Sequence, residues 1–267
     1  MNAKQLITHM MPIPILNLYG KMRKKKSPKY TQYKGASDSV LQCIIAYNKY
    51  GGYCVPLTGY FHFVPQTIFK GNVWEQETTE FIVANLGSGD IIHAGTFFGD
   101  SLPAIANINN KSITWAFEPN PESYRCASIT KIINNLNNVR LFNKGLGEHH
   151  SLEKMKILNN YDGQSMGGGS RMASKAKTYS KNSLIDVEVV AIDEIIPHDR
   201  KIDIIHLDIE GFEKEALTGA TNTIKRCKPI LIIESLPDNE WVTENILNIG
   251  YRIHNKKINK NTVFFPI

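Results

Sequence analysis

The sequence lacks the features that mark several common classes of protein. Its four cysteines show no Cys-x-x-Cys pair and no ligand spacing, which argues against a zinc site or a disulfide framework. No apolar run approaches the roughly 18 residues of a transmembrane helix, and the N-terminal stretch has no small-residue cleavage site. These absences predict a protein with free thiols in a reducing compartment, and we expect it in the cytoplasm.

The amino-acid composition and the net charge exclude few further classes of protein. Hydrophobic residues make up 42% of the chain and charged residues 21%, which is ordinary for a globular protein. The formal net charge is +6, and the basic run Lys21–Lys29 contributes to it. Such a run can meet phosphates or an anionic membrane. We interpret it as a solvated arm and expect no nucleic-acid partner.

The first 73 residues read as an N-terminal extension. After a proline-broken arm, the apolar spacing in Ser37–Tyr50 predicts a helix that Gly51 and Gly52 stop. Aromatic and β-branched residues in Tyr53–Val64 predict a short hairpin. The extension could cover a binding site or mediate formation of a homo-oligomer.

Residues 74–267 predict one α/β domain, because strands and helices alternate from Asp90 onward after a helix at Trp74–Leu86. Strands are expected at Ile91–Ala94, Ile113–Glu118, Val139–Asn143, Val187–Ile192, Ile202–Leu207, Ile230–Glu234, Tyr251–Ile253 and Thr262–Phe265. Helices are expected at Asp100–Ile108, Glu122–Leu136 and Gly211–Lys225. This alternation indicates a mostly parallel, Rossmann-like sheet with helices on both faces.

Two segments 23 residues apart carry the strongest functional signal. IIHAGTFFG (Ile91–Gly99) runs from a buried strand into a glycine turn, and TWAFEPN (Thr114–Asn120) carries Glu118 at the end of a strand. In open α/β sheets such a turn admits a cofactor, and an acid about 20 residues later binds ribose hydroxyls. The pattern predicts an adenosine-type cofactor held by Gly95, Gly99 and Glu118.

The glycine spacing favours S-adenosylmethionine over a dinucleotide. A dinucleotide site normally shows Gly-x-Gly-x-x-Gly, because the pyrophosphate lies on a glycine-lined helix N-terminus. This turn has only Gly95 and Gly99, with Phe97 and Phe98 between them. S-Adenosylmethionine has no phosphate, so the shorter turn suffices for its methionine part.

Further segments resemble the FkbM family of S-adenosylmethionine-dependent methyltransferases between about Trp74 and Ser235. They are AFEPNPESY (Ala116–Tyr124), NKGLGE (Asn143–Glu148), VEVVAIDEII (Val187–Ile196) and the most specific, DIIHLDIEGFEKEALTGA (Asp203–Ala220), followed by PILIIES. The resemblance implies a class I methyltransferase fold. It also implies methyl transfer, usually to a hydroxyl of a saccharide or a natural-product scaffold, so we expect a small-molecule or saccharide acceptor. Asn143 and Gly145 should lie near the adenine.

The chain departs from the family pattern in the cofactor turn. The family usually has an acid where this chain has His93, and an asparagine where it has Phe97. The acid commonly helps to hold the methionine end of the cofactor. We expect His93 and Thr96 to contact the cofactor, and Asp100 to substitute for the acid from the first turn of the next helix.

Methyl transfer to a hydroxyl also requires a group that removes a proton. Asp208 and Glu210 follow the strand Ile202–Leu207, and either could orient the acceptor or act as base; no metal ligand is assigned. Glu210 could equally complement the dipole of the following helix. Glu234 could face the acceptor or be a plain strand-end acid, and His206 is expected to be a hydrogen-bonded core histidine.

A polar insert, YDGQSMGGGSRM (Tyr161–Met172), is expected to be a mobile loop. Loops of this kind are often lids or binding loops. Gln164, Ser165 and Arg171 are therefore candidate substrate contacts, with simple flexibility as the alternative.

Two other functions stay open. Asp208 and Glu210 could form the metal-binding pair of a glycosyltransferase that uses a nucleotide sugar, but the Gly95 and Glu118 pattern would then have no role. The chain could also be a catalytically inactive methyltransferase-like binding module, altered at His93 and Phe97.

Overall fold

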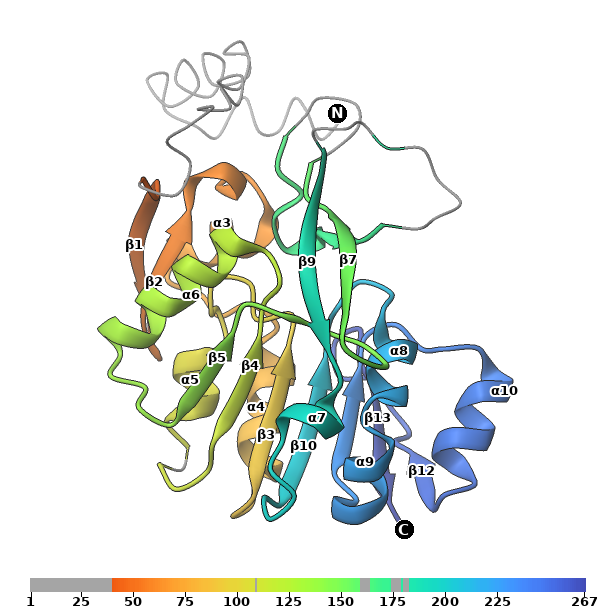
Figure 1. The fold of residues 1–267 in the computed structure, drawn as a ribbon. Helices are drawn as coiled ribbons and strands as arrows, with labels where there is room; N and C mark the ends of the chain where they lie inside the picture. Colours follow the sequence, from red (N-terminus) through yellow and green to blue (C-terminus); the bar gives the residue numbers. More distant parts are fainter. Residues whose placement is uncertain (1–39, 109, 159–163, 174–178, 180–182) are drawn as a thin grey trace, which may run out of the picture. The chain divides into compact units, whose positions relative to one another are not determined.

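The computed structural model describes residues 40–108, 110–158, 164–173, 179 and 183–267, which are coloured in Figure 1. Leu41–Ile267 forms one compact unit. The arm expected over residues 1–35, with the basic run Lys21–Lys29, lies outside the described residues.

A seven-stranded sheet forms the centre of this unit, in the order β12-β13-β11-β10-β3-β4-β5 (Figure 1). Its strands are β3 (Asp90–Ala94), β4 (Thr114–Phe117), β5 (Val139–Phe142), β10 (Ile202–Leu207), β11 (Ile230–Ile233), β12 (Tyr251–Ile253) and β13 (Thr262–Pro266). The strands from β11 to β5 are parallel, and β13 is antiparallel to both of its neighbours. β3 and β4 are buried along their whole length, as expected for a sheet covered on both faces. The expected mostly parallel α/β fold is confirmed.

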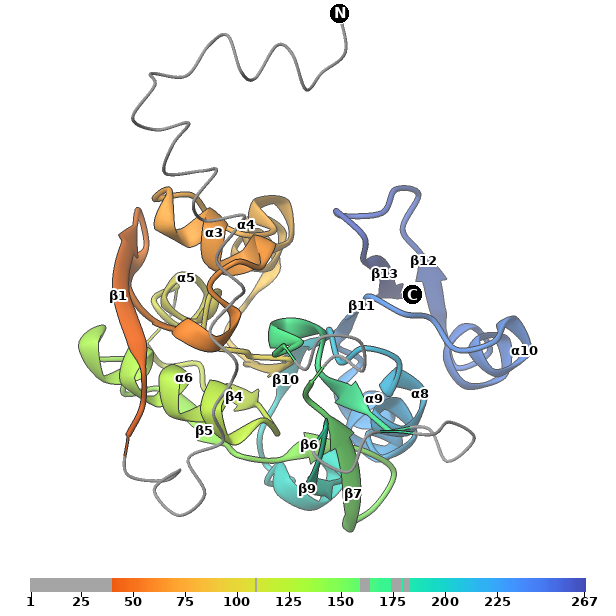
Figure 2. The same cartoon turned by 90° about the horizontal axis from the view of Figure 1, so that it is seen from above.

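Helices cover both faces of the sheet (Figure 2). They are α4 (Gln76–Asn85), α5 (Leu102–Ala106), α6 (Pro121–Ile133), α7 (Ile192–Ile195), α8 (Glu213–Thr218), α9 (Thr221–Cys227) and α10 (Asn239–Val242), with a π-helical turn, η4, at Thr243–Leu247. α4 and α5 pack Ile82 and Ile105 on one face, and α8 and α9 pack Leu217 and Ile224 on the other. Among the described residues, no helix is both long and apolar enough to cross a membrane.

The helix expected over Gly211–Lys225 is divided into α8 and α9. The break lies at Gly219, where a Cβ would come within 2.0 Å of the carbonyl oxygen of Gly147. The loop that contains Gly147 therefore lies too close to the backbone of Gly219 for any residue other than glycine at this position.

The N-terminal part differs from the expectation. Cys43–Asn48 (β1) and Gly51–Pro56 (β2) form an antiparallel hairpin, so the helix predicted over Ser37–Tyr50 is wrong in its described residues. The hairpin predicted over Tyr53–Val64 is also displaced toward the N-terminus. A short apolar run fits a helix and a strand equally well, and the spacing alone could not decide between them.

Residues after the hairpin continue as a 3-10 turn, η1 (Leu57–Gly59), and a helix, α3 (Phe63–Phe69). The hairpin itself packs on α6, where the backbone N–H of Cys54 donates to Thr130 Oγ1 at 3.0 Å.

The chain between β5 and α7 builds a second sheet of four strands, in the order β6-β9-β7-β8, and the polar insert Tyr161–Met172 contributes β8 to it. These strands are β6 (Gly145–Leu146), β7 (Ser151–Lys156), β8 (Arg171–Met172) and β9 (Leu184–Val190). The long strands β7 and β9 lie side by side beyond the carboxyl ends of the parallel strands of the main sheet (Figure 1). In the described residues 164–173, a 3-10 turn, η2 (Gly167–Gly169), precedes β8, so this part of the insert has secondary structure that the sequence did not predict.

Candidate active site

A cavity of about 300 Å³ lies at the carboxyl ends of the parallel strands. Its wall contains Ala94, Gly95, Phe117, Glu118, Asp208 and Glu234 from the ends of β3, β4, β10 and β11. The second sheet adds Gly145, Leu146, Met155, Arg171 and Met172. Of the ten predicted site residues, Gly95, Asp100, Glu118, Gly145, Asp208 and Glu210 line the cavity, whereas His93, Thr96, Gly99 and Asn143 do not.

The glycine turn after β3 has a left-handed backbone at three positions. Gly95 has φ +84°, Gly99 has φ +83°, and Phe97 has φ 50°. A Cβ at Gly95 would lie 1.8 Å from the carbonyl oxygen of Asp208, so the close approach of β3 to the end of β10 requires glycine. A left-handed conformation is costly for a phenylalanine and cheaper for an asparagine. This explains in physical terms why asparagine suits the position of Phe97 in the family pattern.

Glu118 is fixed at the cavity wall by two backbone hydrogen bonds. The N–H of Phe97 donates to its Oε2 at 2.7 Å, and the N–H of Asn120 donates to its Oε1 at 2.8 Å. Burial raises the pKa of Glu118 to about 8, and these two hydrogen bonds oppose the shift. Each carboxylate oxygen has a second lone pair, so both remain able to accept a hydrogen bond from a ligand.

Asn143 supports this arrangement from behind. Its Nδ2 donates to the carbonyl oxygens of Glu118 and Pro119, at 2.9 and 3.1 Å. The side chain therefore braces the turn after β4 and is not part of the cavity wall. Gly145 does line the cavity, and a Cβ there would come within 2.7 Å of Met172 Cε.

His93 belongs to β3, is paired with His206 of the neighbouring β10, and is not in the cavity wall. Its Nδ1 is 2.9 Å from Nδ1 of His206, and its Nε2 is 2.9 Å from Ser101 Oγ. The rings stack at 5.0 Å. Thr96 is also buried, and its hydroxyl donates to the carbonyl oxygen of His93. We expected both side chains to contact the cofactor, but neither of them lines the cavity.

The histidine pair is neutral, and its tautomers follow from the hydrogen bonds. His206 Nε2 is buried and has no partner in the described part of the chain. Because an unmet acceptor is tolerated better than an unmet donor, we assign His206 Nδ1–H as donor to His93, and His93 Nε2–H as donor to Ser101. Burial lowers the pKa of both histidines, that of His206 to about 4. The expectation of a hydrogen-bonded core histidine at His206 is confirmed.

Asp100 lies in the cavity wall just before α5, which begins at Leu102 rather than at Asp100 as predicted. Burial raises the pKa of Asp100 to about 7. A cationic ligand would favour the ionised form of this carboxyl group.

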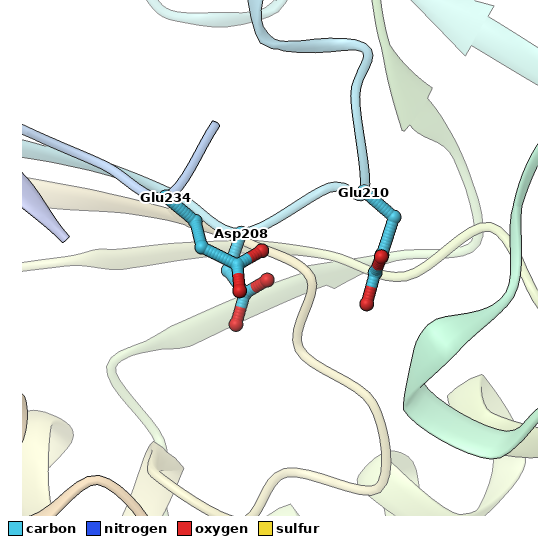
Figure 3. A group of neighbouring side chains, drawn as sticks. All are labelled: Asp208, Glu210 and Glu234. Carbon is cyan, nitrogen blue, oxygen red and sulfur yellow. The ribbon is translucent and has the colours of Figure 1, made fainter. Parts of the chain in front are cut away.

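Three carboxyl groups meet at the ends of β10 and β11 (Figure 3). One oxygen from each of Asp208, Glu210 and Glu234 lies within 4.8 Å of the others. Figure 3 shows the carboxyl groups of Asp208 and Glu234 close together, with that of Glu210 farther away. Burial raises the pKa of Asp208 well above its usual range, and the adjacent Glu234 raises it further. These carboxyl groups could remove a proton from a substrate. They could instead bind one divalent cation, as the glycosyltransferase alternative requires.

Part of the cavity wall was missed from the sequence. His62, Phe63, Trp74, Glu75 and Lys260 all line the cavity. The first three lie in or beside the N-terminal extension, whose fold was wrongly predicted. The run of aromatic residues at positions 60–63 was a signal available in the sequence. In the structure Phe63 lines the cavity and is 83% exposed.

The insert contributes to the same wall. Arg171 and the three glycines of η2 line the cavity, while the contact of Arg171 with a substrate stays a prediction. The carbonyl oxygen of Ser165 lies 2.8 Å from His62 Nε2, which connects the insert to the N-terminal wall. Gln164 is not in the wall.

Comparisons with known proteins identify the family. The family model for the methyltransferase FkbM domain matches residues 87–253, and no curated protein matches the sequence. One similar solved structure is the methyltransferase FkbM from Methylobacillus flagellatus KT, with 23% identity and a TM-score of 0.45. The alignment covers 67% of this chain but only 43% of that one.

Two other similar structures are more distant in sequence. A SAM-dependent methyltransferase from Aquifex aeolicus is 14% identical, with 73% of this chain and 89% of that chain covered and a TM-score of 0.39. The Pyrococcus abyssi tRNA (uracil-54, C5)-methyltransferase, solved in complex with S-adenosyl-L-homocysteine, is 12% identical, with 80% and 40% covered and a TM-score of 0.38. Because the family match extends over well more than half of the chain, this protein belongs to the methyltransferase FkbM domain family.

Proposed function

We propose that the protein is an S-adenosylmethionine-dependent methyltransferase that acts on a hydroxyl group of a saccharide or a natural-product acceptor. One observation carries the proposal: Gly95, Glu118 and Asp208, from the ends of three parallel strands, face a single cavity. Such a cavity can bring a ribose-binding acid and a proton-accepting acid to one bound ligand pair.

The chemistry of the cavity wall fits this cofactor. Glu118 would accept hydrogen bonds from the ribose hydroxyls through the free lone pairs of its two oxygens. Apolar side chains of Phe117, Leu146 and Met155 offer a surface for the adenine ring. Asp100 is the acidic side chain placed to face the cationic methionine end, in the role that the family assigns to the acid replaced by His93.

When bound, S-adenosylmethionine supplies a methyl group on a positively charged sulfur; transfer to a hydroxyl forms a C–O bond, breaks the C–S bond and releases the hydroxyl proton. The chain's own residues must align the acceptor oxygen and take up that proton. Asp208 and Glu210, at the end of β10, are the candidates that the sequence indicates. The aromatic side chains of Phe63 and Trp74 also line the cavity and are candidate contacts for the acceptor.

We further propose that the protein works in the cytoplasm. All four cysteines are free, which agrees with a reducing compartment.

The decisive experiment is calorimetric titration of the protein with S-adenosylmethionine and S-adenosylhomocysteine. Micromolar binding is the expected result, and a screen of saccharide acceptors for S-adenosylhomocysteine formation would follow. Absence of binding at millimolar ligand would refute the proposal. A parallel titration with a nucleotide sugar and Mn²⁺ distinguishes the glycosyltransferase alternative, and failure of both ligands to bind would leave a binding module of another kind.

A further inference from the structure

Asp208 and Glu234 form a carboxyl pair at the ends of neighbouring parallel strands. β10 and β11 are in register up to Leu207 and Ile233, so the next residues of the two strands lie side by side. The backbone N–H of Glu234 donates to the carbonyl oxygen of Leu207 at 3.1 Å, which extends this register to the pair. The two carboxyl groups are within hydrogen-bonding reach of one another, and both line the cavity (Figure 3).

A hydrogen bond between two carboxyl groups requires a proton, because two carboxylates offer only acceptors. The surrounding charges place this proton on Asp208. Asp208 faces the negative charges of Glu75 and Glu210 in addition to that of Glu234. Glu234 has a cation nearby, since Lys260 Nζ lies 3.9 Å from its Oε1. The proton of this hydrogen bond therefore lies on Asp208, which donates it to Glu234.

We propose that Glu234 is the catalytic residue that takes up the acceptor's proton, and that protonated Asp208 holds it in position. This inference rests on the proposed function, since the proton comes from the hydroxyl that is methylated. The pair begins with one proton and one negative charge. It ends with two protons and no charge, which balances the loss of the positive charge on the methyl donor.

Glu210 is less suited to this role. Burial raises the pKa of Glu210 and the nearby Glu234 raises it further, while Arg171 and Lys260 oppose this shift. Its carboxyl group also lies apart from the pair in Figure 3. The charged groups around the pair thus come from the segment before α4 (Glu75), the turn after β10 (Glu210), β8 (Arg171) and the turn before β13 (Lys260).

Infrared titration tests the shared proton without any substrate. Glu118 and Asp100 also contribute to the protonated-carboxyl absorption of the wild-type protein near neutral pH. One component of this absorption at about pH 7 should be absent from Asp208→Asn and retained in the exposed control Asp238→Asn. In Glu234→Gln the midpoint of this component should fall by about one pH unit or more, because a charged neighbour is lost. Absence of any component that Asp208→Asn removes, or an unchanged midpoint in Glu234→Gln, would overturn the proposal.

A second variant tests the same assignment in case Glu234→Gln does not fold. Lys260 is largely exposed, so Lys260→Met should fold normally, and it should raise the midpoint by removing the cation beside Glu234. An unchanged or lowered midpoint would contradict the assignment of the charge to Glu234. Micromolar binding of Mg²⁺ or Mn²⁺ that Glu234→Gln abolishes would also overturn it, because a metal ion would then occupy the place of the proton.

Kinetics on an acceptor from the saccharide screen assign the base. Glu234→Gln should lower kcat by about 10²- to 10⁴-fold, the usual contribution of a general base. Asp208→Asn retains a hydrogen-bond donor and should lower kcat less; the reverse order would make Asp208 the base. A wrong proposed function would give a different result. The protein would then not bind S-adenosylmethionine, although its infrared titration would still show the protonated carboxyl group of the Asp208–Glu234 pair.

Discussion

Replacing Glu118 by glutamine isolates the contribution of one carboxylate to cofactor binding. Alanine would be a poorer choice, since it would leave the backbone N–H groups of Phe97 and Asn120 without their acceptor. Each such loss costs about 1–3 kcal/mol of folding stability when the group is buried. Glutamine keeps one oxygen and nearly the same shape, so it leaves one of these two N–H groups without its acceptor instead of both.

The expected effect follows from hydrogen bonds to a charged group, which contribute about 1.5–3 kcal/mol each. Loss of one ribose hydrogen bond should therefore weaken S-adenosylmethionine binding by about 10- to 150-fold. The pH dependence gives a second readout. Because burial raises the pKa of Glu118 to about 8, its ionisation on cofactor binding releases a proton. Affinity of the wild type should rise by about tenfold between pH 7 and pH 9, in addition to any titration of the ligand.

Isothermal titration calorimetry in buffers of different ionisation enthalpy measures both the affinity and the released proton. Glu77→Gln is a matched control, because Glu77 is exposed on α4 and does not line the cavity. Glu118→Gln should bind weakly and release fewer protons, while the control should match the wild type. Unchanged affinity in a folded Glu118→Gln protein would refute the placement of the ribose at Glu118.

Three further predictions concern stability and are measured by urea unfolding. Gly95→Ala should cost about 3 kcal/mol or more, because its Cβ would lie 1.8 Å from the carbonyl oxygen of Asp208; Gly211→Ala, with φ +97° but nothing within 4 Å, should cost only about 1–2 kcal/mol. Equal losses would contradict the role of the close approach. Burial lowers the pKa of His206 to about 4, so its contribution to the free energy of unfolding is fully present above about pH 6.5. This contribution, about 3 kcal/mol, is lost as the pH falls toward 4. His206→Asn should reduce the change of the free energy of unfolding with pH, and an unaltered change would exclude His206 as its source. Phe97→Asn relieves a left-handed phenylalanine by about 1 kcal/mol but removes a buried ring worth about 3–5 kcal/mol, so a net loss is expected, and a gain would show that strain outweighs packing.

The sequence by itself determined the central sheet and the position of the site along the chain. The strands β3, β4, β10 and β11 are short, mostly apolar runs that are buried along most of their length. Burial on both faces leaves little choice of structure for such runs. The glycine turn at Gly95 and the acid at Glu118 were also readable, because their chemistry depends only on residue type and on spacing from a strand end.

Only the tertiary structure decided which side chains face the cavity. His93 belongs to the cofactor turn in sequence, yet its ring is buried against His206 of β10. Asn143 braces backbone carbonyls behind the turn. Both outcomes depend on which strands become neighbours and in what register, which no local pattern specifies.

The same physical reason explains the carboxyl pair and the N-terminal wall. Asp208 and Glu234 meet because β10 and β11 are adjacent and in register, although 26 residues separate them in the sequence. Phe63 and Trp74 line the cavity from segments that follow the β1–β2 hairpin, and a short apolar run could not distinguish that hairpin from a helix. Local spacing defined the elements of this protein, and long-range pairing of those elements defined the groups that line its cavity.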